Sequence, residues 1–98
     1  MVYHRKFMTM ERLTECRKLI DAIDLRLLEL LNERTKIVEE IGRVKQALSL
    51  PIYEPRREDQ VFQNVLDNNT GPMPGDSVKR VFERIIDEMR TIQRDKMH

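Results

Sequence analysis

Residues 9–50 read TMERLTECRKLIDAIDLRLLELLNERTKIVEEIGRVKQALSL, a stretch with no proline and a single glycine, Gly42. Apolar side chains recur in this stretch at steps of three and four residues, which is the period of one helix face. The pattern predicts one long helix from about Thr9, as its N-cap, to about Leu50, where Pro51 ends it. The stripe comprises Leu13, Cys16, Ile20, Ile23, Leu27, Leu30, Arg34, Ile37, Ile41, Lys45 and Leu48.

Two cations, Arg34 and Lys45, occupy positions on this otherwise apolar stripe. Burying an isolated cation costs several kcal/mol unless a negative group meets it. The protein therefore either pairs these charges internally or holds them for an anionic ligand. Eleven residues separate them, so they share a face with about 16 Å between their backbones, and they can line one pocket.

Two shorter helices are predicted after the first. Pro55 fits a first helical position, and the buried face that follows is formed by Val61, Phe62, Val65 and Leu66. Residues 68–75 are rich in Asn, Gly and Pro and cannot continue that helix. Asp76 is expected to cap a third helix, whose stripe is Val78, Phe82, Ile85, Met89 and Ile92. With no strand signal, the predicted fold class is all-α.

The composition narrows the class of protein. Ninety-eight residues make one small domain, and 40% hydrophobic with only 5% aromatic residues is typical of a helical bundle. A net charge of +1 argues against nucleic-acid binding, and no apolar run is long enough for a membrane span or signal peptide. The single cysteine, Cys16, fits a buried hydrophobe in a reducing compartment, so a cytoplasmic location is expected. Residues 1–10 are expected to be a flexible extension, and residues 11–98 the functional domain.

The length of the first helix predicts an oligomer. About 40 residues at about 1.5 Å each reach roughly 60 Å, whereas a compact monomer of this size has a radius of gyration near 13 Å. The two shorter helices cannot cover such a stripe. We therefore expect another copy to bury part of it, in an antiparallel, intertwined homodimer.

A dimer allows more polar groups to meet in one interior site. Arg17 lies about 25 Å from Arg34 along the helix, too far to join it within one chain, but an antiparallel partner can supply it. Gln93 places a neutral amide on the apolar face of the third helix. Arg57 and Glu58 stand four residues before two core positions of the second helix. Cations, one carboxylate and one amide are thus predicted to converge.

From about Leu13 to Gln93 the sequence resembles the all-α chorismate mutases of the AroQ type. The resemblance rests on four groups of residues: Arg17 followed by Ile23-Asp24, Leu30-Leu31-Asn32-Glu33-Arg34, Ile41-Gly42 followed by Lys45, and Pro55-Arg56-Arg57-Glu58. It implies that Arg34, Arg57 and the other subunit's Arg17 bind two substrate carboxylates. It further implies that Lys45 and Gln93 approach the ether oxygen of the substrate and that Glu58 holds its ring hydroxyl.

The implied activity is the pericyclic rearrangement of chorismate to prephenate in aromatic amino-acid biosynthesis, which needs no metal or cofactor. Two positions depart from the family pattern: Glu54 stands where many members carry aspartate, and Met89 where the residue is often small or hydroxylated. Both are expected to touch the hydroxyl end of the substrate and to adjust affinity or efficiency. The linker from Gly71 to Pro74 is similar to that of mutase modules fused or docked to another aromatic-pathway enzyme, which suggests a docking partner.

Two other functions remain open at this point. An isochorismate pyruvate lyase shares the scaffold, although Glu58 and the spacing from Lys45 to Arg57 favour the mutase. A non-catalytic helical dimerisation or regulatory module is the second alternative. In such a module, mutating Lys45 would leave the function intact. Taken singly, Arg34 can snorkel or pair across the bundle with a glutamate, Glu58 can act as an anion at a helix N-terminus, and Gln93 can lie on the surface.

Overall fold

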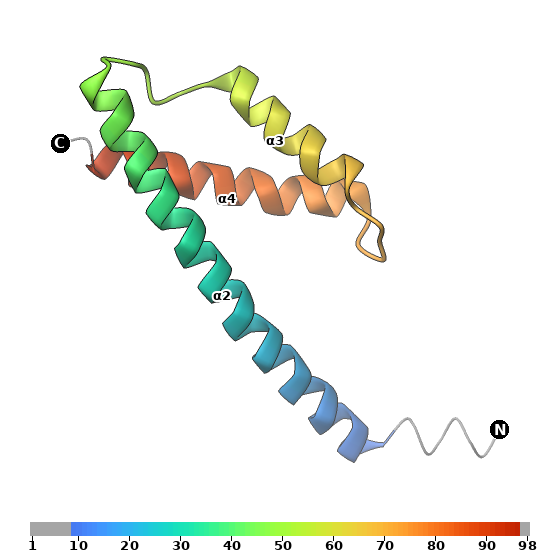
Figure 1. Cartoon of the computed structure of the whole chain (residues 1–98). Coiled ribbons are helices and arrows are strands. Elements are labelled where there is room, and N and C mark those ends of the chain that lie inside the picture. Colours follow the sequence, from blue (N-terminus) through green and yellow to red (C-terminus); the bar gives the residue numbers. More distant parts are fainter. Residues whose placement is uncertain (1–8, 97–98) are drawn as a thin grey trace. The chain divides into compact units, whose positions relative to one another are not determined.

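The computed structural model describes residues 9–96 and is all-α in that range. It contains the helices α2 (Met10–Ala47), α3 (Pro55–Asp67) and α4 (Gly75–Lys96) (Figure 1), so the predicted fold class and helix order are confirmed. Most of the predicted N-terminal extension, residues 1–8, lies outside the described residues. In the described part of the chain, no helix is both long enough and apolar enough to cross a membrane.

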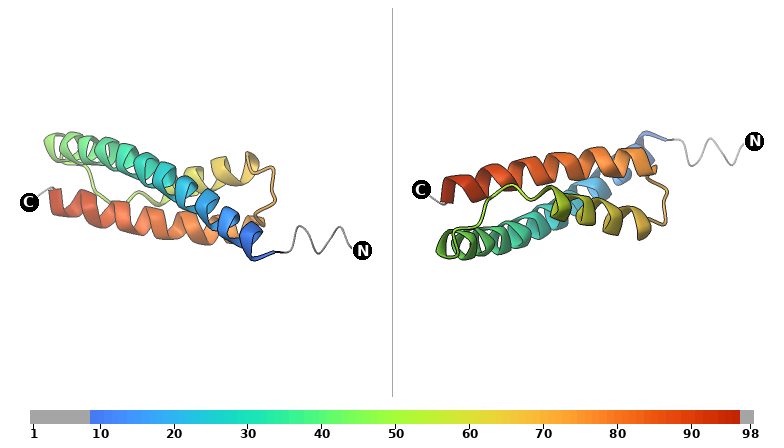
Figure 2. Two further views of the ribbon diagram at one scale, coloured as in Figure 1. Left: turned by 90° about the horizontal axis from the view of Figure 1, so that it is seen from below. Right: turned by 90° about the horizontal axis from the view of Figure 1, so that it is seen from above.

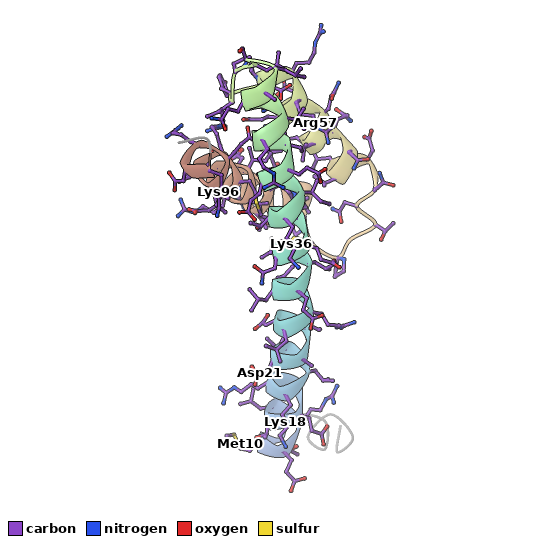
Figure 3. The ribbon with its side chains drawn as sticks, turned by 60° about the vertical axis from the view of Figure 1, so that its left-hand side comes forward. Met10, Lys18, Asp21, Lys36, Arg57 and Lys96 are labelled. Carbon is purple, nitrogen blue, oxygen red and sulfur yellow. The ribbon has the colours of Figure 1, made fainter. Side chains whose placement is uncertain are left out.

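The chain divides into two compact units, residues 1–34 and 35–98. The described part of the first unit is the beginning of α2, along which Met10, Lys18 and Asp21 are labelled in Figure 3. Thr9 caps this helix as predicted, because its Oγ1 accepts a hydrogen bond from the backbone N–H of Arg12 at 3.0 Å.

The apolar side chains of the first unit are largely exposed in the single chain. Leu27 is 50% exposed and Leu30 is 61% exposed. Their neighbours on the predicted stripe share this exposure: Leu13, Ile20 and Ile23. Exposed apolar side chains that recur along one helix face are typical of an interaction surface.

The second unit consists of the end of α2 together with α3 and α4. α3 packs against α4, to which a short loop joins it, and the views of Figures 1 and 2 agree on this arrangement. The buried residues of α2 are Val38, Gly42 and Lys45, whereas Ile37 and Ile41 are exposed. Three residues of α4 complete the apolar core: Val78, Ile86 and Met89. The end of α2 thus has one covered face and one uncovered apolar face.

α2 ends earlier than predicted. Its last residue is Ala47, and Ser49 adopts a left-handed conformation with φ of 56°. The Leu50 N–H then donates to the Lys45 carbonyl at 2.8 Å, which closes the helix in the manner of a Schellman motif. The prediction of an end near Leu50 was therefore wrong by three residues, because the chain turns at Ser49 before it reaches the proline.

The starts of the two shorter helices were predicted with mixed success. Pro55 is the first residue of α3, as expected from its fixed φ and missing N–H. Asp76, in contrast, is not the cap of α4, because the helix already begins at Gly75. The Val78 N–H closes the first turn on the Pro74 carbonyl at 3.0 Å. Asp76 stands inside that turn, where its negative charge complements the helix dipole.

Candidate active site

Lys45 and Gln93 meet inside the second unit. Each residue is only 7% exposed, and Lys45 Nζ donates a hydrogen bond to Gln93 Oε1 at 2.9 Å. Lys45 comes from the last turn of α2 and Gln93 from the end of α4, so the contact joins two elements distant in sequence. A charged ammonium is therefore held in the interior beside a neutral amide.

The linker before α3 supplies the other two partners of Lys45. Its Nζ donates to the Ile52 carbonyl at 2.9 Å and forms an ion pair with Glu54 Oε1 at 2.7 Å. An ammonium group has three N–H donors, and these two contacts with that to Gln93 occupy all three. The carboxylate of Glu54 compensates the charge of Lys45. The Glu54 side chain is 48% exposed, whereas the side chain of Lys45, taken without its backbone, is 9% exposed.

Glu58 pairs with an arginine that the sequence analysis did not select. Both Nε and Nη2 of Arg90 donate to Glu58 Oε2, at 3.2 Å and 2.5 Å, and this joins α4 to the first turn of α3. The ring of Tyr53 lies 5.1 Å from the Arg90 guanidinium carbon, and Asp87 Oδ1 lies 3.4 Å from Nη1. The pKa of Arg90 is raised from its ordinary value, chiefly by the hydrogen bond to Glu58, so Arg90 stays charged.

The Lys45 cluster and the Arg90 pair are neighbours in the fold. Tyr53 and Glu54 are consecutive in the linker, and they contact Arg90 and Lys45 respectively. Arg90 and Gln93 stand three residues apart on α4, which places them on the same side of that helix. The linker and one face of α4 therefore bring an ammonium, an amide, a guanidinium and two carboxylates together.

Two of the predicted arginines, Arg17 and Arg57, are exposed in the single chain. Arg57 is exposed at the start of α3 (Figure 3), where its Nη1 lies 3.4 Å from Gln60 Oε1 of the same helix. Arg17 is exposed on α2. Arg34 is half-buried and has an interaction partner. Within the second unit, the structure thus joins Lys45 and Gln93, while Arg57 contacts Gln60 of its own helix.

Met89, the second departure from the family pattern, is buried on α4 beside this region. Its Sδ accepts a weak hydrogen bond from Thr35 Oγ1 at 3.5 Å, which links α4 to α2. A thioether is a poor hydrogen-bond acceptor, so its part here is mainly to fill space.

Three contributors were missed by the sequence analysis: the Ile52 carbonyl, Tyr53 and Arg90. A backbone carbonyl leaves no trace in the sequence. Arg90, however, stands three residues before Gln93, and this spacing could have marked it as a member of the same helix face. Among the residues that the structure describes, no group of three or more His, Cys, Asp or Glu side chains is arranged to hold a metal ion.

Comparison with known proteins points to one family. The model of the family "Chorismate mutase type II" matches residues 16–94. The chain is 28% identical over 92 residues to a chorismate mutase of Methanocaldococcus jannaschii, with 86% of each protein covered. Its fold is similar to the structure of a chorismate mutase (form II) from Thermus thermophilus, with a TM-score of 0.83 and 32% identity, covering 85% of this chain and 94% of the other.

Some of the relatives are much longer proteins. The chain is 37% identical over 89 residues to a bifunctional chorismate mutase/prephenate dehydratase of Aquifex aeolicus. The match covers 87% of this chain but 25% of that relative. The chain therefore spans about a quarter of the length of the bifunctional relatives that it matches.

Proposed function

Because the chain belongs to the type II chorismate mutase family, we propose that it catalyses the rearrangement of chorismate to prephenate. The observation that carries this proposal is the buried Lys45 ammonium hydrogen-bonded to the buried Gln93 amide. Sites that hold a cation in the interior beside a neutral donor favour a reaction in which negative charge develops on one substrate atom.

The chemistry requires this kind of preorganised charge. In the rearrangement a C–O bond breaks while a C–C bond forms, and negative charge grows on the ether oxygen. Lys45 and the amide nitrogen of Gln93 donate to that oxygen and stabilise the transition state more than the ground state. No nucleophile, metal or cofactor takes part in this mechanism.

Access to Lys45 requires an exchange of partners. All three N–H donors of its ammonium are engaged in the single chain, so one contact must open before the ether oxygen can be bound. Glu54 is the partner that leaves, because its side chain is half exposed and belongs to the linker. The buried Gln93 and the Ile52 carbonyl then keep the ammonium aimed into the site.

The arginines bind the two carboxylates of the substrate. Arg34 and Arg57 come from one chain and Arg17 from a second copy, and each guanidinium can form a bidentate pair with a carboxylate. Holding both carboxylates fixes the flexible substrate in its reactive conformation and lowers the entropic part of the barrier. Glu58 accepts a hydrogen bond from the ring hydroxyl, and Glu54 and Met89 adjust the fit at that end.

The apolar surface of α2 supports a second copy, as does the proposed role of Arg17. Apolar side chains of the predicted stripe are exposed in each unit, from Leu13 at 40% exposure in the first unit to Leu48 at 63% in the second. An antiparallel copy of the same stripe offers a surface of equal length and matching chemistry, which makes a closed homodimer. Each active site of this dimer contains residues of both subunits.

The remaining assignments follow from the family and the composition. Residues 11–98 form the mutase domain, with residues 1–10 as an extension. The free thiol of Cys16 fits a reducing compartment, and we place the reaction in the cytoplasm. Docking to another aromatic-pathway enzyme is supported by the relatives in which the matching segment is part of a bifunctional protein.

The test is the loss of the ultraviolet absorbance of chorismate with purified protein, with product identification. We expect rapid loss with prephenate as product, and no loss with the variant Arg34→Ala. Salicylate and pyruvate formed from isochorismate would instead indicate a lyase. No loss at high enzyme concentration would contradict catalysis by this chain and favour the binding module.

A further inference from the structure

Arg90 holds Glu58 in an arrangement that differs from an ordinary surface ion pair. The side chains of Arg90 and Glu58 are 26% and 22% exposed. By comparison, the side chains of Arg84 and Glu88, which pair with each other on the same helix, are 77% and 53% exposed. Exposed pairs of that kind contribute little to stability, whereas the attraction within a partly buried pair is screened much less by solvent and salt.

Three neighbours fix the plane of the Arg90 guanidinium. Glu58 binds its Nε and Nη2 edge, Asp87 contacts Nη1 from the preceding turn, and the Tyr53 ring lies over the group at 5.1 Å. Cation–π contact with an aromatic face and charge-assisted hydrogen bonds act together here. The guanidinium is therefore preorganised before any ligand arrives.

The two hydrogen bonds from Arg90 both end on the same oxygen of Glu58, Oε2. An ionised carboxylate has about four lone-pair sites on two oxygens. The contact with Arg90 thus uses one oxygen and leaves the lone pairs of Oε1 to accept another donor. A carboxylate held in this way has a fixed orientation.

We propose that Arg90 is a positioning residue, which holds Glu58 through Oε2 so that Oε1 can accept the hydrogen bond of the substrate's ring hydroxyl. The inference rests on the proposed function. Arg90 itself does not touch the substrate. The same face of α4 carries Gln93 one turn further on, so a single helix positions both the group at the ether oxygen and the group that orients Glu58.

The test compares kcat and KM of four variants with those of the wild type: Arg90→Met, Arg90→Lys, Glu58→Gln and the double variant Glu58→Gln/Arg90→Met. We expect Arg90→Met to lower kcat/KM by about tenfold, chiefly through KM, because a hydrogen bond to a charged group is weakened. Arg90→Lys should recover part of the loss by keeping the charge. In a protein that already carries Glu58→Gln, Arg90→Met should lower kcat/KM by less than a further factor of about two.

The matched control is Arg84→Met, which removes an arginine of the same helix that pairs with a different carboxylate. It should leave kcat and KM unchanged. Circular dichroism and thermal melts give the unfolding temperature of each variant, and every assay is run below that temperature. A purely structural role for Arg90 would lower the melting temperature and leave the KM of the folded enzyme unchanged, which overturns the proposal.

Two outcomes separate the inference from the function on which it rests. If the wild type converts chorismate but the effects of Glu58→Gln and Arg90→Met multiply, the two residues act independently and the inference is wrong. If the wild type has no mutase activity, the proposed function fails and the inference fails with it. As a spectroscopic check, the NMR signal of the Arg90 Nε–H should shift in Glu58→Gln and stay in place in Glu88→Gln.

Discussion

At the scale of single residues, we infer that Glu54 controls how Lys45 becomes available to the substrate. Its carboxylate occupies one of the three ammonium donors, yet its side chain is half exposed and can move away. We predict that Glu54→Gln changes kcat/KM by less than about tenfold, because its ion pair with Lys45 is partly solvated. Steady-state kinetics with chorismate measure the effect. Complete loss of activity would show that Glu54 is indispensable and contradict its role as a displaceable partner.

Some of these residues were visible in the sequence and others were not. Lys45 and Gln93 stood out because a cation and an amide on apolar stripes need partners, and the structure joins them. Arg90 lies beside the predicted stripe of its helix, where an arginine is ordinarily solvated. Its partnership with Glu58 depends on how α3 packs against α4, which residue spacing within one helix does not reveal.

At the scale of elements, the end of α2 sets the position of the linker that carries Glu54. Ser49 holds a left-handed conformation there, which is unfavourable for a residue with a Cβ atom. We predict that Ser49→Gly stabilises the protein by about 0.5–1 kcal/mol, measured by urea unfolding. In the control Ser77→Gly, within the first turns of α4, glycine should destabilise by about 0.5–1 kcal/mol. Destabilisation by Ser49→Gly would contradict this account of the helix end.

Helix order followed from proline, glycine and apolar spacing, but helix ends depended on local hydrogen bonds. Pro51 suggested that α2 continues to Leu50, whereas the turn at Ser49 ends it at Ala47. Asp76 suggested a cap, whereas α4 starts at Gly75. In each case more than one residue could end or begin the helix, and backbone geometry selected among them.

At the scale of the whole molecule, the apolar side chains of α2 that are exposed in the single chain favour association with a partner. We predict that the protein is a dimer by size-exclusion chromatography with light scattering, and that Leu30→Glu destabilises the dimer. A charge buried at an interface without a partner costs several kcal/mol. The control Met73→Glu, at a loop residue that is 48% exposed, should leave the dimer intact. An active, folded monomer would contradict the shared active site.

The most direct test of the account is the turnover number of Lys45→Gln beside that of the control Lys36→Gln, a labelled lysine on the same helix (Figure 3). We predict that kcat of Lys45→Gln falls by about 10²–10³-fold, with a smaller change in KM, because the transition state loses its central charge. Lys36→Gln should match the wild type. A folded Lys45→Gln that loses affinity but keeps its kcat would contradict the assignment of Lys45 to the ether oxygen.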